Sequence, residues 1–167
     1  MTKDIPQNAK VIIIGGGIIG CSVAYHLTKF GCNDVVLLER DQLTSGTTWH
    51  AAGLVSQLGP TAAITKIRKY TLDLYKKLEN EVDHSAGLRL NGALSIAQTD
   101  ARWQELQRQA TTAQLYDVDI KILDKETIKK MYPMMHTNDL KGGVLMPGDG
   151  AADPSGVTHM LAKAARK

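Results

Sequence analysis

The sequence lacks the usual marks of a secreted, membrane-spanning or nucleic-acid-binding protein. Its only two cysteines, Cys21 and Cys32, stand eleven positions apart without paired metal-ligand spacing, which is typical of reduced thiols in a cytosol-like compartment. The longest apolar run, Val11–Ile14 extended through glycines to Ile19, is too short to cross a bilayer, and no basic region with a small-residue cleavage site precedes it. The 20 basic and 17 acidic residues give a net charge of +3 and form no basic arm that would neutralise a phosphate backbone.

The composition that remains is that of a globular domain. Apolar residues make up 43% of the 167 residues and charged residues 22%, which is ordinary usage for a folded protein and far from that of a disordered chain. This length can bury one core but hardly two independent ones. We therefore expect one compact unit, or a piece of a larger one.

Residues 10–39 predict one strand, helix, strand unit. Val11–Ile14 is a continuous β-branched run, as expected for a parallel strand buried on both faces. A helix is predicted over Gly17–Phe30, with Gly31 as its left-handed C-terminal cap, and Val35–Leu38 forms the second strand. The polar, glycine-bearing stretch 41–59 has little periodicity, and we expect an ordered loop or short helix near a ligand.

The rest of the chain predicts a smaller α+β layer inserted into the first. The expected elements are a long amphipathic helix over 60–82, a strand over 92–97, a helix over 100–115, a strand over 120–123, a short helix capped by Asp124, a strand near Val144, and a helix opened by Asp153 and Pro154 that runs to Arg166. The predicted fold class is α/β. The predicted domains are a Rossmann-like βαβ unit (1–59), a partial substrate or cap region (60–140) and an incomplete return to the first domain (141–167). Two parallel strands cannot bury both faces of a sheet, so the chain resembles the truncated front portion of a longer protein.

The turn Gly15-Gly16-Gly17-Ile18-Ile19-Gly20 carries the chemistry, because it fits G-x-G-x-x-G between a strand and a helix. Gly15 permits a tight turn, Gly17 lets a pyrophosphate approach the backbone, and Gly20 lets helix and strand pack closely. The helix N-terminus then offers N–H groups to the phosphates. Glu39 ends the second strand nineteen positions after Gly20, where its carboxylate would accept ribose hydroxyls and repel a 2′-phosphate. The motif predicts a dinucleotide site that disfavours NADP. The alternative is a glycine-rich turn that binds no ligand and has only a structural role.

The segment after Glu39 distinguishes between the dinucleotides that the motif could bind. Where an NAD domain more often continues through another helix and strand, this sequence has small hydroxylated residues and glycines, Leu43 to Leu54, that can offer donors to a pyrophosphate. The sequence resembles the flavin region of the dimethylglycine and sarcosine dehydrogenases, within the D-amino-acid-oxidase-like FAD oxidoreductases. The resemblance lies in the glycine turn, in Leu37-Leu38-Glu39-Arg40 and especially in Thr44-Ser45-Gly46-Thr47-Thr48-Trp49-His50-Ala51-Ala52-Gly53-Leu54. Pro147-Gly148-Asp149-Gly150 followed by Asp153-Pro154 is also similar to that family.

The resemblance implies FAD as the cofactor, attached covalently through His50 to the 8α-methyl of the flavin. From the sequence alone, a histidine in such a loop is more often a hydrogen-bonding residue. The implied cofactor-binding residues are Gly15, Gly17, Ile18, Ile19 and Gly20 at the pyrophosphate, Glu39 at the ribose with Arg40 beside it, and Gly46, Thr47, Thr48, Trp49, His50, Ala51, Ala52, Gly53 and Leu54 around the flavin. No catalytic residue and no metal ligand is assigned.

The function implied is oxidation of an N-methyl amine of the dimethylglycine or sarcosine type, with hydride transfer from the N-methyl carbon to FAD. Tetrahydrofolate enters only if a further carboxy-terminal region exists, and the electron acceptor stays open. The alternatives are a non-catalytic flavoprotein-like regulatory or interaction module, an inactive fragment, and an NAD-linked dehydrogenase. We expect no nucleic-acid partner, a possible partner chain that completes the fold, and bacterial cytoplasm rather than the mitochondrial matrix, because no Arg/Ser-rich leader precedes Val11.

Overall fold

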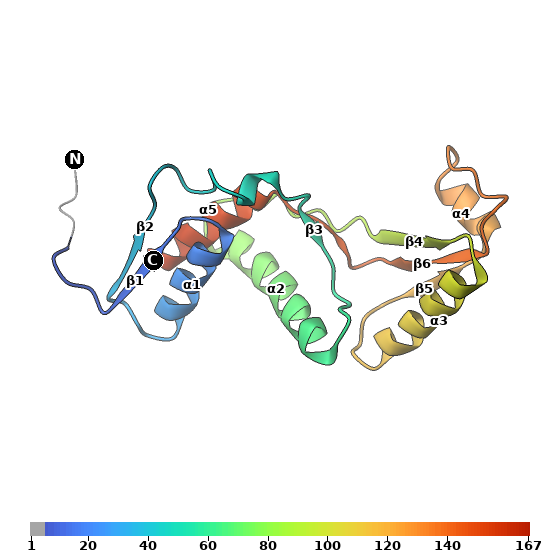
Figure 1. The fold of residues 1–167 in the computed structure, drawn as a ribbon, viewed down its shortest axis with the longest axis horizontal. Helices are drawn as coiled ribbons and strands as arrows, with labels where there is room; N and C mark the ends of the chain where they lie inside the picture. Colours follow the sequence, from blue (N-terminus) through green and yellow to red (C-terminus); the bar gives the residue numbers. More distant parts are fainter. Residues whose placement is uncertain (1–5) are drawn as a thin grey trace. The chain divides into compact units, whose positions relative to one another are not determined.

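The computed structural model describes residues 6–167, which form two compact units. One unit comprises the chain up to Gly53 together with Leu74–Leu88 and Ala152–Lys167, and the other comprises Leu54–Asp73 and Arg89–Ala151. The elements in chain order are β1 (Val11–Ile14), α1 (Ile18–Lys29), β2 (Val35–Leu38), η1 (Thr48–His50), β3 (Leu54–Val55), α2 (Ala62–Glu81), β4 (Ala93–Ala97), α3 (Asp100–Gln114), β5 (Lys121–Leu123), α4 (Lys125–Met131), β6 (Gly142–Met146), β7 (Gly150–Ala151) and α5 (Pro154–Ala165) (Figure 1).

The first unit contains the predicted βαβ arrangement. Strands β1 and β2 pair in parallel, with Val11 opposite Val35 and Ile14 opposite Leu38, and α1 connects them. Gly31 follows α1 with a φ of +86°, so the predicted left-handed cap is confirmed. Helix α5 packs against α1 in the same unit (Figure 1). The predicted mixed α/β fold class is therefore confirmed.

The prediction that Val11–Ile14 is buried on both faces is wrong. Successive side chains of a strand point to opposite faces. Ile13 lies on the face that packs against α1, close to Gly20, whereas Ile12 is 59% and Ile14 87% exposed. A β-branched run predicts a strand, but burial on its second face depends on what packs there, and among residues 6–167 nothing covers it.

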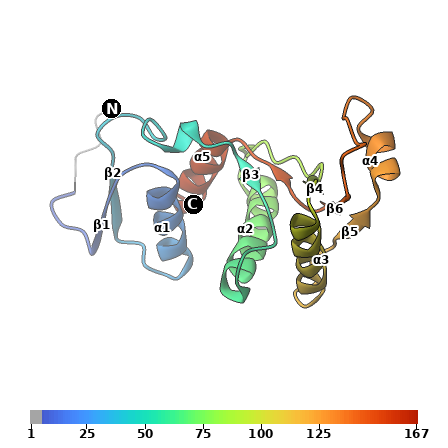
Figure 2. The same cartoon turned by 45° about the vertical axis from the view of Figure 1, so that its right-hand side comes forward.

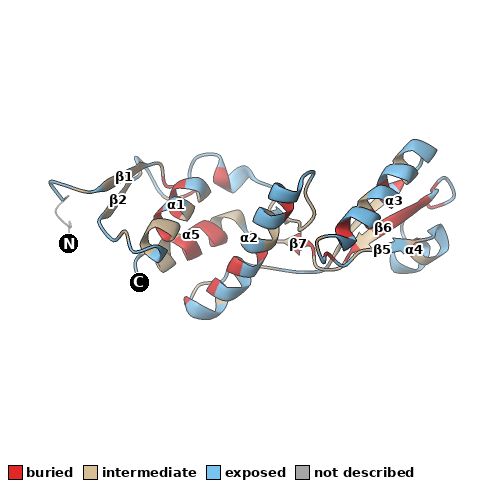
Figure 3. Cartoon of the chain, turned by 90° about the horizontal axis from the view of Figure 1, so that it is seen from below, coloured by how far each residue is buried: buried red, intermediate tan, exposed pale blue. Residues whose placement is uncertain are grey.

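The core of the first unit joins segments from distant parts of the sequence. Leu74 and Leu78 of α2, and Val82 directly after it, pack with two residues of α1 and three of α5, namely Cys21, Tyr25, Val157, Met160 and Leu161. Figure 3 shows the buried residues as a nearly continuous stretch along α5. The second half of α2 therefore belongs to the first unit. The domain ranges 1–59, 60–140 and 141–167 stay a prediction.

The second unit is the expected α+β layer. Its antiparallel sheet has the order β4-β6-β5, in which Ser95 and Ile122 both pair with Val144. Helix α3 packs on this sheet through Leu106 and Ala110, which join Ala97 and Val144 in the core (Figure 2). A short antiparallel pair, β3 with β7, belongs to the same unit. No helix within residues 6–167 is long and apolar enough to span a membrane.

Two predicted helix caps are present. The side chain of Asp124 accepts a hydrogen bond from the Thr127 N–H at the start of α4, and α4 ends before Pro133 as predicted. Asp153 caps α5: its Oδ1 accepts from the Ser155 N–H at 3.1 Å and its Oδ2 from the Gly156 N–H at 3.0 Å. Both caps rest on contacts within three residues, which is why the sequence alone predicts them.

The Asp153→Ala substitution is expected to lower the free energy of unfolding by about 1 kcal/mol, because two N–H groups of the first turn of α5 lose their acceptor. Urea denaturation followed by circular dichroism measures the change. Asp153→Asn is the matched control, since asparagine is an equally good N-cap and is expected to keep wild-type stability. An asparagine variant as unstable as the alanine variant would contradict a capping role.

Candidate dinucleotide-binding site

The glycine turn is built so that only glycine fits at its two ends. Gly15 has a φ of +108°, and its N–H donates to the Leu38 carbonyl at 2.8 Å, which ties the turn to the end of β2. A Cβ on Gly20 would lie 1.9 Å from the Gly15 carbonyl oxygen and 3.3 Å from Ile13 Cγ2. The turn therefore brings α1 directly against β1, as the motif predicts.

Helix α1 presents its N-terminus at this turn. Gly17 is the N-cap and supplies no side-chain acceptor, and the first turn carries no acidic residue that would repel an anion. The Ile18 N–H, expected at a pyrophosphate, instead donates to Thr48 Oγ1 at 3.0 Å. Within the described chain, the amides of Gly17, Ile19 and Gly20 have no hydrogen-bond acceptor, so these N–H groups remain for a phosphate.

Glu39 lies beside the turn. Its Oε2 accepts from the Gly16 N–H at 2.6 Å and its Oε1 from the Asp41 N–H at 3.0 Å. The hydrogen bond from Gly16, and then that from Asp41, lowers the pKa of Glu39 below its ordinary value, so the carboxylate is charged at neutral pH. Each oxygen keeps a second lone pair with which to accept a hydroxyl group. The role of Glu39 at a ribose stays a prediction.

The loop after β2 docks onto the glycine turn through Thr44 and Thr48. The Thr44 N–H donates to the Gly16 carbonyl at 3.1 Å, and Thr48 Oγ1 accepts from Ile18. Both threonines are buried, and Thr44 has a φ of +75°, which is uncommon for a residue other than glycine. From α5, Ser155 Oγ donates to Thr44 Oγ1 at 3.3 Å. Thr44 and Ser155 were not among the predicted site residues, because neither backbone strain at a threonine nor a contact 111 residues away is visible in a motif.

Trp49 and His50 lie on the short helix η1, and both are exposed. Their ring centroids are 3.8 Å apart with 34° between the ring planes. His50 Nδ1 lies 3.3 Å from the Gly46 carbonyl oxygen, which can only accept a hydrogen bond. The tautomer of a neutral imidazole that makes this contact carries its proton on Nδ1 and has its lone pair on Nε2.

The other predicted loop residues differ in their surroundings. Gly53 has a φ of +71°, and its carbonyl accepts from the Ala152 N–H at 2.8 Å. The remaining residues expected at the cofactor are exposed, namely Arg40, Gly46, Thr47, Ala51, Ala52 and Leu54. The structure therefore brings together the glycine turn, Glu39 and Thr48, while these six residues and the Trp49–His50 pair are exposed to solvent.

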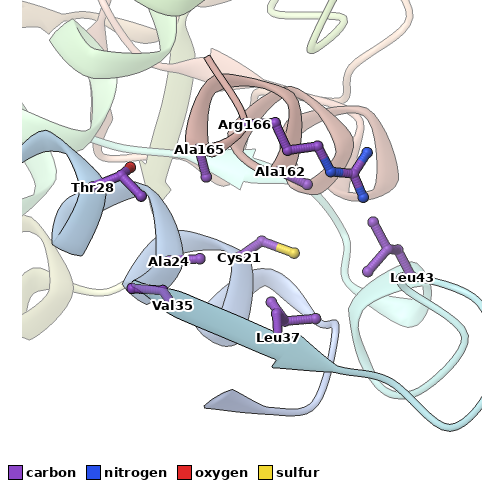
Figure 4. Close-up of a pocket in the computed structure, with 9 residues that line it drawn as sticks. All are labelled: Cys21, Ala24, Thr28, Val35, Leu37, Leu43, Ala162, Ala165 and Arg166. Atoms are coloured by element: carbon purple, nitrogen blue, oxygen red, sulfur yellow. The ribbon is translucent and has the colours of Figure 1, made fainter. Parts of the chain in front are cut away.

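A separate cavity of about 200 Å³ lies among α1, β2 and α5 (Figure 4). Its lining is mostly apolar and includes Cys21, Leu37 and Leu43, with Arg166 at its edge. Burial raises the pKa of the Cys21 thiol, and the Arg166 charge opposes that effect. The volume is below that of a typical small-molecule site and far too small for a dinucleotide, so the cofactor site is not this cavity.

The residues at the turn fit the phosphates of a dinucleotide. No atom lies within 4 Å of the position a Cβ on Gly15 would occupy, so the outer side of the turn is open to a ligand. The Ile19 and Gly20 amides and the positive end of the α1 dipole suit an anion, and Glu39 lies where the strand β2 ends. A parallel βαβ unit with this turn and this acid defines a Rossmann-type dinucleotide-binding protein.

The chain belongs to the FAD dependent oxidoreductase family (DAO), whose pattern matches residues 10–167. Human mitochondrial dimethylglycine dehydrogenase is 41% identical to it over 96% of this chain, and human mitochondrial sarcosine dehydrogenase is 40% identical over 98%. The chain spans only 19% and 18% of the lengths of these two relatives. The predicted resemblance is confirmed. Both relatives are named as mitochondrial, which does not favour the expected bacterial cytoplasm, and the compartment of this chain stays a prediction.

Solved structures share the fold. L-proline dehydrogenase from P. horikoshii superposes with a TM-score of 0.87 at 26% identity, over 97% of this chain and 42% of that one. Dithionite-reduced L-α-glycerophosphate oxidase from Mycoplasma pneumoniae, a structure with FAD bound, gives a TM-score of 0.80 at 23% identity, over 96% of this chain and 43% of that one. The second likeness concerns the fold alone.

Proposed function

We propose that this chain is the FAD-binding part of an enzyme that oxidises an N-methyl amine of the dimethylglycine or sarcosine type. The observation that carries the proposal is the docking of the loop onto the glycine turn through Thr44 and Thr48, which brings His50 to the same unit as the dinucleotide motif. The 40% identity to dimethylglycine and sarcosine dehydrogenases over nearly the whole chain supports the choice of substrate class.

Each part of the site has a role in this proposal. Gly17, Ile19 and Gly20 bind the pyrophosphate through their backbone N–H groups, Gly15 leaves the outer side of the turn open to it, and Glu39 accepts hydrogen bonds from the ribose. The loop from Gly46 to Leu54 surrounds the flavin. When bound, FAD supplies an acceptor for the hydride of the amine substrate. We assign none of residues 6–167 to proton transfer or to tetrahydrofolate.

His50 is the proposed covalent attachment point. Because Nδ1 is engaged with the Gly46 carbonyl, Nε2 is the nitrogen with a free lone pair and is the atom we expect in the bond. The exposure of His50 leaves this nitrogen accessible to the flavin ring.

The test is to mix the purified chain with FAD, desalt it, and record its absorbance before and after anaerobic addition of amines. Dimethylglycine and sarcosine are expected to bleach the flavin. Trimethylglycine is the matched control, since its quaternary nitrogen has no lone pair to assist hydride loss. A chain that keeps no FAD contradicts the proposal, and a chain that keeps FAD but is bleached by none of the amines favours a non-catalytic flavoprotein module.

A further inference from the structure

Asp149 is a buried carboxyl group with one unsatisfied oxygen. It lies in the turn between β6 and β7, and it is 1% exposed. Oδ1 accepts from the Gln57 backbone N–H at 2.9 Å and faces the Gln57 side-chain amide at 3.5 Å. Oδ2 is buried and has no hydrogen-bond partner among residues 6–167. An unpaired buried oxygen is costly to stability, so its retention calls for a function.

Asp149 is one of three side chains that fasten a short segment, Gln57–Gly59, which we call the strap. Asp149 accepts from the first strap residue. Arg68 of α2 donates to the Leu58 carbonyl, and Thr65 Oγ1 accepts from the Gly59 N–H at 3.0 Å. All of these residues belong to the second compact unit. Every residue of the strap is thus tied by a side chain from elsewhere in that unit.

The strap begins three residues after Leu54, the last residue of the loop proposed to surround the flavin. That loop ends at Leu54, which with Val55 forms β3, and β3 pairs with Gly150 and Ala151 immediately after Asp149. The antiparallel pairing and the Asp149–Gln57 hydrogen bond therefore continue one another along the same two segments. Loosening the strap would free the carboxy-terminal end of the loop.

We propose that Asp149 is a positioning residue that fixes the strap and, through it, the carboxy-terminal end of the loop Gly46–Leu54. The consequence for FAD retention rests on the proposed function, whereas the consequence for the strap does not. When protonated, Asp149 keeps Oδ1 as an acceptor for Gln57 and carries the proton on Oδ2, which removes the negative charge from this buried carboxyl group.

The surroundings of Asp149 favour that neutral form. Burial raises its pKa above the ordinary value of 3.8, while the Gln57 hydrogen bonds and the Arg68 charge act in the opposite direction. Three groups face Asp149 from the elements around it. They are the neutral side chain of Gln57 in the strap, the Gly92 N–H, which donates to the backbone carbonyl of Asp149, and the charged Arg68 of α2. Because the folded state binds this proton more tightly than the unfolded chain, its stabilising effect is present below pH 3.8 and is lost as the pH rises through the raised pKa.

The test is hydrogen exchange measured by mass spectrometry on the full chain. Asp149→Ala is expected to speed exchange at Gln57–Gly59 by about tenfold, the effect of one lost hydrogen bond, while α3 exchanges as in the wild type. Asp149→Asn keeps the acceptor for Gln57 and cannot ionise, so it is expected to restore protection. Its advantage over the wild type is expected to grow as the pH rises above 3.8.

Two further variants complete the test: one loosens the strap without changing Asp149, and the other is a control. Thr65→Val preserves the shape of a fully buried side chain and removes the Gly59 hydrogen bond, so it is expected to loosen the strap independently of Asp149. Asp139→Ala removes an exposed carboxylate of the same unit that pairs with His136 and Gln98, and it is expected to leave the strap unchanged.

Retention of FAD after desalting is the second readout, expected to fall about tenfold in Asp149→Ala and Thr65→Val and to be unchanged in Asp139→Ala. Wild-type exchange at the strap in Asp149→Ala, or an asparagine variant as loose as the alanine variant, would overturn the inference. A loosened strap with wild-type FAD retention would overturn its link to the loop. A wild-type chain that retains no FAD would overturn the proposed function, and the exchange at the strap would still decide the role of Asp149.

Discussion

Replacing Gly20 with alanine is expected to weaken FAD binding at least about tenfold and to lower the free energy of unfolding by about 2 to 3 kcal/mol. The new Cβ would lie 1.9 Å from the Gly15 carbonyl oxygen and 3.1 Å from the Gly15 carbonyl carbon, so the backbone itself must move. The same movement displaces the turn and the Ile19 amide that we propose to bind the pyrophosphate. Binding to phosphate through backbone groups tolerates little displacement, and a loss of at least about tenfold in affinity is expected.

Urea denaturation and a fluorescence titration with FAD measure the two effects. Gly46→Ala is the folding control, because a Cβ there meets no atom within 4 Å and Gly46 does not have a positive φ. Its free energy of unfolding is expected to stay within about 0.5 kcal/mol of the wild type. An alanine at position 20 with wild-type stability and wild-type FAD affinity would disprove the close contact between α1 and the end of β1.

Replacing His50 with alanine is expected to eliminate covalently bound flavin. Acid precipitation of the wild-type chain should leave flavin absorbance in the pellet, and precipitation of the variant should release all of it to the supernatant. The reason is that the proposed bond needs a nitrogen lone pair, which His50 offers at Nε2 because Nδ1 contacts the Gly46 carbonyl. Non-covalent FAD should still bind, since the glycine turn and its contacts with Thr44 and Thr48 do not involve His50.

His136→Ala is the matched control for this experiment. His136 is also exposed, but it lies in the other compact unit, beside Asp139. Its removal is expected to leave covalent flavin at the wild-type level. Flavin that stays in the pellet of the His50 variant would exclude His50 as the tether, and peptide mapping would then identify the residue that carries it.

Local patterns were enough to predict most elements of this chain. The helices α1, α2, α3 and α5 begin and end within a few residues of the predicted positions, because apolar periodicity and caps act over one or two turns. The glycine turn was predictable for the same reason, because its motif lies within six consecutive residues.

The parts of the site that the sequence did not reveal depend on long-range contacts. Thr44 adopts a left-handed conformation because its amide and hydroxyl are held by Gly16 and Ser155. Asp149 and Gln57 are 92 residues apart, and no spacing rule connects them. The family resemblance pointed to the turn that contains Asp149, but neither the buried oxygen nor the strap follows from it.

The sequence by itself determined the parallel βαβ unit, its dinucleotide motif, the capped helices and the family, because each depends on short-range preferences or on residue identity in a fixed order. Only the tertiary structure decided which face of β1 is buried, which N–H groups at α1 remain for a phosphate, and how the strap after the loop is held. Burial and hydrogen-bond partners are properties of neighbours in space, and those neighbours are brought together only when distant segments pack.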